Sequence, residues 1–389
     1  MTEINPTLRP GVVVDPPVDG YAIIHDGNRR KYFRMGAREA AFLSSLDGAT
    51  SPEQLRAEQR LGFTAEQTGR LVDWLEQNQL LECSVALGKD ADQAGWRRAL
   101  NYVIYPDKFR FTLFNPDSFL DRHRRAVDAL FGRSAVALYL LVFLSPFFML
   151  VVFSDQFFAA FSNYDPVMPI WQWPLLYVSM LIITFFHEMS HAAACKHFGG
   201  KVEVVGVMLL YLNPVAYCDI SASWRFASAT DKVIVSGAGI FFQMLVASIS
   251  FSLFGFVHET FFAYLAIANA FFAIFNLIPF VKLDGYWMLV HLSGQPNLRR
   301  KSLEAIDSAV RRFLGSGVSR GSSDRLLLAF GMAHLVFVPL FWLAGVAAIY
   351  RVAKILAPSL ALYACAPFFA LLLYRLSKSA SAYVNSLRT

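Results

Sequence analysis

Residues 170–195 read IWQWPLLYVSMLIITFFHEMSHAAAC, which is the most informative segment of the chain for its fold. A helix of about 20 residues crosses the roughly 30 Å hydrocarbon core of a bilayer, so the stretch is long enough to span it. Its second half nevertheless holds His187, Glu188 and His191. Because ionisable side chains inside a membrane helix are costly, they mark a functional site. The stretch therefore predicts a transmembrane helix that carries polar chemistry.

The composition places that helix in a polytopic membrane protein. Of the 389 residues, 56% are hydrophobic and only 16% are charged, whereas soluble domains are about 25% charged. This excludes disordered, collagen-like and coiled-coil chains. The fold class we expect is mainly α, a polytopic membrane helix bundle with a short β-hairpin near its site. Long apolar runs predict about six spans, at 134–153, 170–195, 233–256, 260–280, 326–348 and 355–375.

The distribution of charge predicts the orientation in the membrane. Basic residues cluster before the first span and in 282–325, whereas 154–169 has no Lys or Arg. Because positive loops stay on the cytoplasmic side, we expect a multi-pass protein of the cell inner membrane with its N-terminal domain and site facing the cytoplasm. The net charge of +6 is explained by these flanks. We expect the lipid bilayer and no nucleic acid as a partner, since no basic patch interleaved with aromatic residues is present.

Four regions follow from this pattern. Residues 1–83 predict an N-terminal α+β winged-helix-like domain, 84–133 a basic amphipathic connector, 134–376 the transmembrane domain, and 377–389 a cytoplasmic tail. The first region begins with the short β-rich runs VVVD, YAIIH and RKYFRM, of which the last two flank the turn sequence Asp26-Gly27-Asn28. Three helical patterns follow, and two of them begin with the capping-box pairs Ser51–Gln54 and Thr64–Gln67.

Residues 202–219 form a Val-rich segment that is too short for a span and is interrupted by Asn213-Pro214. It predicts a hairpin or re-entrant loop, which survives at membrane depth only when it is buried in protein or lines a wet cavity. An exposed edge of such a hairpin could hold an extended substrate through main-chain hydrogen bonds.

The sequence H-E-x-x-H at 187–191 predicts a metal site. His187 and His191 are four residues apart, so both imidazoles face the same side of a helix and can bind one Zn²⁺ ion. Glu188 lies about 100° round the helix, close enough to take a proton from an attacking water. We therefore expect Zn²⁺ as the cofactor and Glu188 as the catalytic base of a hydrolytic reaction.

A catalytic zinc needs a third protein ligand, and three residues are candidates. Cys195 lies about 12 Å along the helix axis from His187, too far to share the ion. Asp219 follows the hairpin and could reach back, or it could hydrogen-bond around Ser221. Asp284 lies at the inner end of the fourth span, at the depth of the two histidines, and is the favoured ligand.

These residues carry a resemblance to a known family. H-E-x-x-H in one span and N-x-x-P-x-x-x-L-D-G at 276–285 in a later one resemble the site-2 protease family of intramembrane zinc metalloproteases, and in particular its bacterial peptide zinc metalloprotease type. The resemblance implies that His187, His191 and Asp284 bind zinc, that Glu188 is the catalytic base, and that 134–376 is a transmembrane zinc protease domain. The resemblance to this family covers residues 170–302 well.

Three residues are candidates for substrate binding. The span 233–256 resembles the family's small-residue G-x-x-x-N pattern, with Gln243 where an Asn is expected. Asn276 and Asp219 complete the set.

The predicted N-terminal domain, residues 1–83, is called the front domain below. It resembles the peptide-recognition element of ribosomal peptide maturases, which implies that a precursor peptide adds a strand to its hairpin. The expected function is peptide maturation by intramembrane proteolysis, with a peptide or protein substrate. Site-2-type cleavage of a membrane-anchored regulator, a non-hydrolytic export or immunity component, and a homo-oligomer remain open.

Overall fold

The computed structural model describes two small antiparallel sheets in a mostly helical chain. Five of its helices are long and apolar enough to cross a membrane. The described residues are 6–17, 20–27, 31–48, 50–52, 54, 62–82, 110–152, 154–155, 168–210, 213–313, 325–356, 358–360, 362 and 365–366.

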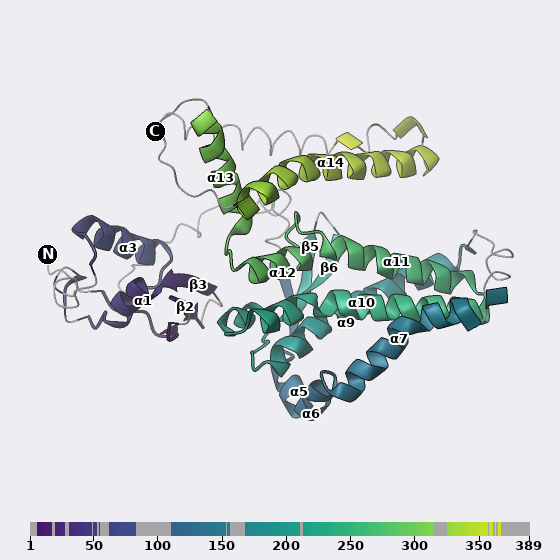
Figure 1. The fold of residues 1–389 in the computed structure, drawn as a ribbon, viewed down its shortest axis with the longest axis horizontal. Helices are drawn as coiled ribbons and strands as arrows, with labels where there is room; N and C mark the ends of the chain where they lie inside the picture. Colours follow the sequence, from purple (N-terminus) through teal and green to yellow (C-terminus); the bar gives the residue numbers. More distant parts are fainter. Residues whose placement is uncertain are drawn as a thin grey trace.

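The front domain begins with a sheet in the order β1-β2-β3. Its strands are β1 (Val12–Val14), β2 (Tyr21–Asp26) and β3 (Lys31–Gly36), and all pairs are antiparallel. The strands predicted from the β-rich runs are thus confirmed. The helices α1 (Ala37–Ser44) and α3 (Ala65–Gln77) follow, and Figure 1 shows this unit at one end of the long helices.

The two faces of the β2–β3 hairpin have different surroundings. Ile24 and Met35 point inward and form a core with Phe42 of α1 and Leu75 of α3. Because side chains alternate along a strand, the opposite face carries the intervening residues. We call this the outer face, and its residues are Tyr21, Ile23 and His25 of β2 and Tyr32 and Arg34 of β3.

Both predicted capping boxes are present. The Thr64 backbone N–H donates to Gln67 Oε1 at 2.9 Å, and the Gln67 N–H donates to Thr64 Oγ1 at 3.2 Å. Ser51 and Gln54 make the same reciprocal pair at 3.2 and 3.3 Å. The body of the second predicted helix lies outside the described residues, and the winged-helix-like assignment stays a prediction.

The long helices form a bundle around α10 (Ala229–Val257). It packs against α7 (Arg133–Val152), α9 (Gln172–His197) and α11 (Thr260–Leu277), and Figure 1 shows these four side by side. Large apolar side chains on α7 remain exposed, for example Leu141 and Phe147 at 67% each. Such a surface suits lipid contact rather than water.

The fifth apolar helix is α14 (Arg325–Leu356), which runs past the predicted end of its span at 348. The apolar helices correspond to the first five predicted spans, and the sixth, 355–375, lies largely outside the described residues. Short elements connect the bundle, namely η2 (Ser221–Arg225), α12 (Asp284–Ser293), the amphipathic α13 (Leu298–Phe313) and η3 (Pro358–Leu360).

The second sheet contains the predicted hairpin. The strands β5 (Val205–Leu210) and β6 (Asn213–Cys218) pair antiparallel, with Val205 opposite Cys218. A third strand, β4 (Arg110–Phe114), pairs with β5 and gives the order β4-β5-β6. The sequence did not reveal β4, which falls within the predicted connector 84–133. Its partner lies some ninety residues downstream, and such non-local pairing leaves no local pattern.

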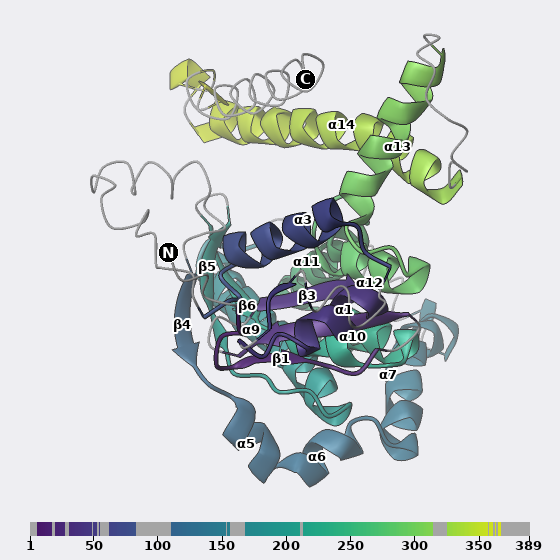
Figure 2. The same cartoon turned by 90° about the vertical axis from the view of Figure 1, so that its left-hand side faces the viewer.

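The rest of that connector is attached to the end of α9 through α5 (Asp117–Arg122) and α6 (Arg124–Ala129), and Figure 2 shows both helices below the sheet strand β4. Buried Lys196 of α9 donates to Asp117 Oδ1 at 2.8 Å and pairs with Asp121 at the same distance. Asp117 also accepts from the Val202 backbone N–H. One carboxylate therefore ties α5, the end of α9 and the start of the hairpin together.

Replacing Asp117 by Ala should lower the apparent melting temperature. The buried Lys196 ammonium and Val202 N–H would lose an acceptor, at a cost of about 1–3 kcal/mol. Asp121→Ala is the matched control, since Asp121 is 56% exposed and touches only the same lysine among these groups. Equal melting temperatures for the two variants in detergent would contradict this role of Asp117.

The same pair predicts a dependence on pH. Burial alone would raise the pKa of Asp117, but hydrogen bonds from Lys196 and the Val202 N–H outweigh it and hold that pKa below its ordinary value. A lowered folded-state pKa gives stability that is present above about pH 3.9, the unfolded value, and lost as the pH falls through the folded value. The wild type should thus lose more stability than Asp117→Ala on acidification below about pH 4.

Candidate metal centre

The two histidines of H-E-x-x-H lie one helical turn apart on α9 and face the same side. The Nε2 atoms of His187 and His191 are 3.2 Å apart, and both side chains are buried. His191 donates its Nδ1–H to the backbone carbonyl of Val235 on α10 at 2.7 Å, which fixes Nε2 as the ring nitrogen with the free lone pair. The buried Nε2 lone pair of His191 therefore faces the Nε2 atom of His187, an arrangement that favours a cation bound between the two rings.

Asp284 at the first position of α12 completes the set. Its Oδ2 lies 3.1 Å from His187 Nε2 and 3.4 Å from His191 Nε2. Ligand atoms about 2.0–2.1 Å from a tetrahedral zinc ion are about 3.3 Å from one another, which the separations among these three residues match. Two imidazoles and one carboxylate are also a donor set of catalytic zinc sites, which keep a fourth position open. The residues therefore fit zinc.

Gly239 of α10 makes room for this cluster. A Cβ atom at that position would overlap the ring nitrogens of both His187 and His191. The helix α10 thus approaches the two imidazoles with its bare backbone, and any side chain there would occupy the space between the ligands and the helix.

A second glycine controls the position of Asp284. A Cβ on Gly285 would collide with the backbone of Leu277 at the end of α11. The absence of a side chain lets α12 begin directly against α11, and this contact aims the neighbouring carboxylate at α9.

Glu188 lies beside the three residues rather than among them. Its Oε1 is 4.0 Å from His187 Nε2, and its carboxylate lies near the backbone N–H of Cys218 at the end of β6. The carboxylate is therefore next to the β5–β6 hairpin and just outside the group of ligand atoms. This is where a general base for a water attacking near the metal would have to be.

The other predicted residues lie apart from the ligand cluster. Asp219 accepts a hydrogen bond from the Ser221 backbone N–H at 3.0 Å. This local hydrogen bond is the alternative to zinc binding that the sequence analysis considered for Asp219. Cys195 is buried in an apolar cluster with Val202 and Val235. Among the described residues, His187, His191 and Asp284 form the one group of three able to hold a metal ion.

Gln243 and Asn276 meet each other in the bundle. Asn276 Nδ2 donates to Gln243 Oε1 at 3.3 Å, and Gln243 is buried one turn beyond Gly239 on α10. The pair joins α10 to α11, so the structure brings together two of the three residues predicted to contact substrate.

Two contributors to the site were not identified from the sequence, namely the Val235 carbonyl and the Cys218 N–H. Both are backbone groups, which every residue carries, so no residue type could signal them. Only the packing of α10 and β6 against α9 gives them a role.

Comparison with known proteins adds a match at this site. A model of the family described as Peptidase M50B-like matches residues 166–208, which include α9 and most of β5. The chain is similar to M50B-type peptidases. No solved structure matches it.

A curated relative points the same way. The "Putative peptide zinc metalloprotease protein YydH" of Bacillus subtilis (strain 168) is 27% identical over 124 residues, which make up 30% of this chain and 47% of the relative. The match thus spans about half of the relative's length. Together with the five apolar helices, these similarities indicate a membrane protein of the metallopeptidase type.

Replacing Gly239 by Ala should remove the metal, because the added methyl group would displace both imidazole ligands. Zinc content per protein, measured by mass spectrometry after purification, should fall to near zero. Gly237→Ala is the matched control two residues away, where a Cβ would meet only the flexible end of Met288 at 3.3 Å. Full zinc occupancy in Gly239→Ala would contradict the arrangement.

Proposed function

We propose that this protein is an intramembrane zinc endopeptidase that hydrolyses a peptide bond with His187, His191 and Asp284 as zinc ligands. The observation that carries the proposal is the convergence of these three side chains beside Glu188. The similarity to M50B-type peptidases supports it.

The residues around the site have separable tasks in this reaction. Zinc bound there would polarise the scissile carbonyl and make water a better nucleophile at neutral pH. Glu188 takes a proton from the attacking water and gives it to the leaving amine. The Cys218 N–H lies beside the carboxylate, and the Val235 carbonyl keeps His191 in its ligating tautomer.

Replacing Glu188 by Gln should abolish cleavage and leave zinc bound, because the amide keeps the shape of the side chain and loses the proton acceptor. General-base catalysis contributes about 10²–10⁴-fold, so the rate should fall by at least that range. Glu304→Gln on the exposed side of α13 is the matched control. Full activity of Glu188→Gln would overturn the assignment, and a wild type without turnover would favour a non-hydrolytic export or immunity component.

The third ligand can be tested by metal content alone. Asp284→Ala should strip or loosen the zinc, since it removes one of the ligand atoms. Asp219→Ala should leave it bound, because Asp219 hydrogen-bonds within its own turn. If zinc content were unchanged in Asp284→Ala and reduced in Asp219→Ala, Asp219 would be the ligand instead.

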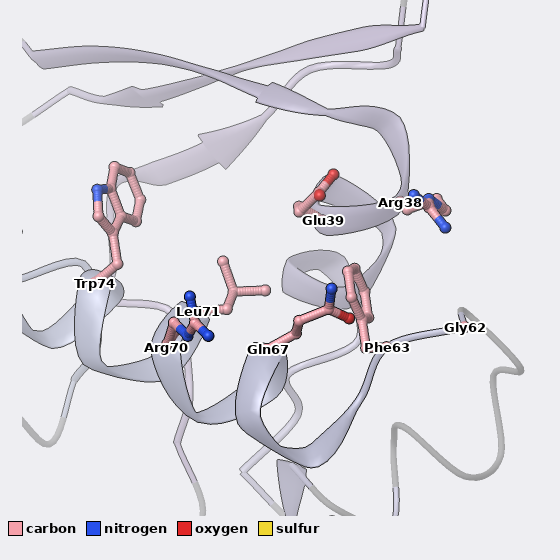
Figure 3. Close-up of a pocket in the computed structure, with 8 residues that line it drawn as sticks. All are labelled: Arg38, Glu39, Gly62, Phe63, Gln67, Arg70, Leu71 and Trp74. Carbon is pink, nitrogen blue, oxygen red and sulfur yellow. The ribbon is translucent and has the colours of Figure 1, made fainter. Parts of the chain in front are cut away.

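The front domain supports a proposal about the substrate. We propose that it captures a precursor peptide of a ribosomally made natural product, with the peptide added as a strand at β3, an outer strand of the sheet order β1-β2-β3. A cavity of about 380 Å³ lies between α1 and α3. Figure 3 shows Trp74, Leu71 and Gln67 of α3 facing it together with Glu39 of α1, so it could seat a side chain of the bound peptide.

The topology expected from charge completes this proposal. With the front domain and the site on the cytoplasmic side of the inner membrane, a newly made precursor would meet both without crossing the bilayer. In the cleavage assay, turnover of a small soluble precursor supports peptide maturation, whereas turnover restricted to a single-span protein supports site-2-type cleavage of a membrane-anchored regulator.

A further inference from the structure

A large cavity lies between the front domain and the membrane domain. Its volume is about 830 Å³, which falls in the range of ligand sites, about 300–1,000 Å³. It is separate from the cavity between α1 and α3, since the two share no lining residue. We call it the interdomain groove.

The front wall of the groove is the outer face of the β2–β3 hairpin. Tyr21, Ile23 and His25 of β2 and Tyr32 and Arg34 of β3 all line it. Ile23 is directly opposite Arg34, and His25 opposite Tyr32, so these side chains form one continuous surface. A sheet face that would meet solvent in an isolated domain here faces the membrane domain.

Specific contacts hold the two walls together. Arg225 of η2 donates from Nε and Nη2 to the two carboxylate oxygens of Asp15, both at 2.7 Å. Burial raises the pKa of the Tyr32 phenol, and the nearby Asp219 carboxylate adds to this effect, which places Tyr32 against the membrane domain. The bidentate pair fixes the orientation of the front domain as well as its distance.

The back wall leads to the metal centre along two elements. Asp219 lines the groove and directly follows Cys218, whose N–H lies near Glu188. His291 also lines the groove and lies seven residues after Asp284 on α12, about 10 Å along the helix axis. The groove thus has one lining residue next to Cys218 in the chain and another about 10 Å along α12 from the third ligand.

The lining suits a polypeptide. Tyr21, Tyr32 and Trp224 supply aromatic surface and Arg34 a planar cation, and Tyr, Trp and Arg are the residues that dominate peptide and protein recognition. Burial, with a contribution from the charge of Lys232, lowers the pKa of His291 to about 4. This histidine is therefore neutral at physiological pH and adds an uncharged ring beside Trp224.

We propose that the interdomain groove binds the segment of the peptide substrate next to the scissile bond, in an extended conformation, and guides it from the outer face of the β2–β3 hairpin to the metal centre. This inference rests on the proposed peptidase function. In this proposal the front domain both captures the peptide and lines its path to the metal centre. Strand addition at the edge of β3 uses main-chain groups, whereas the groove uses the side chains of the sheet face, so one peptide can engage both.

The first test narrows the groove. Ala227 lines it and is exposed, so Ala227→Trp adds bulk without disturbing a core. With a fluorogenic mixture of random peptides of about ten residues, roughly 33 Å when extended, we expect KM to rise about tenfold, equal to about 1.4 kcal/mol, with kcat and zinc content unchanged. Ala126→Trp on α6, also exposed, is the matched control. Equal KM values for the two variants would overturn the proposal.

The second test does not require turnover. Tyr32 is replaced by the photoreactive p-benzoylphenylalanine in the Glu188→Gln protein, and the same peptides carry fluorescein. We expect crosslinking at position 32 and none when the photoreactive residue replaces Phe119, which is 56% exposed on α5.

The two tests separate the proposals. Crosslinking at position 32 without cleavage by the wild type would overturn the peptidase function and support peptide binding in the groove. Cleavage by the wild type with no crosslink at position 32 would overturn the groove and leave the peptidase function standing.

Discussion

The structure depends on keeping three ionisable side chains together among apolar helices. His187 and His191 approach each other with their Nε2 atoms, and Asp284 brings a carboxylate within 3.4 Å of both. Buried ionisable groups are costly unless they are paired or coordinate a metal. This cluster can share a cation, and His191 Nδ1 on its outer side donates to the Val235 carbonyl.

The rest of the bundle makes room for this cluster by bringing bare backbone close to it. The helix α10 approaches the imidazoles through Gly239, and α12 starts against α11 through Gly285. The strand β6 ends at Cys218, whose N–H lies near Glu188. A side chain at either glycine would separate the helices. The two glycines are thus needed by the cluster, because only bare backbone can come this close.

Contacts outside the cluster then fix the β5–β6 hairpin and the front domain relative to the site. Asp117 binds Lys196 and the start of the hairpin segment, and β4 extends the sheet. On the other side, the Asp15–Arg225 pair sets the β2–β3 face across the groove. Each of these contacts joins residues far apart in the chain, and the Asp15–Arg225 pair fixes the two walls of the interdomain groove relative to each other. The front domain and the membrane domain in this way contribute to one cavity.

Elements whose signals are local could be predicted from the order of residues alone. Apolar runs gave the first five spans, the turn sequence gave the β2–β3 hairpin, and the Ser51–Gln54 and Thr64–Gln67 pairs gave helix starts, since hydropathy, turns and caps depend on neighbouring residues. The spacing of H-E-x-x-H put two imidazoles on one face for the same reason. The expected depth of Asp284 in the membrane and the resemblance to a known family favoured it over Asp219. Only the folded chain shows which carboxylate reaches the histidines, where β4 pairs, which backbone groups lie against His191 and Glu188, and that the outer face of a sheet lines a groove. These depend on contacts between distant segments, which the order of residues along the chain does not record.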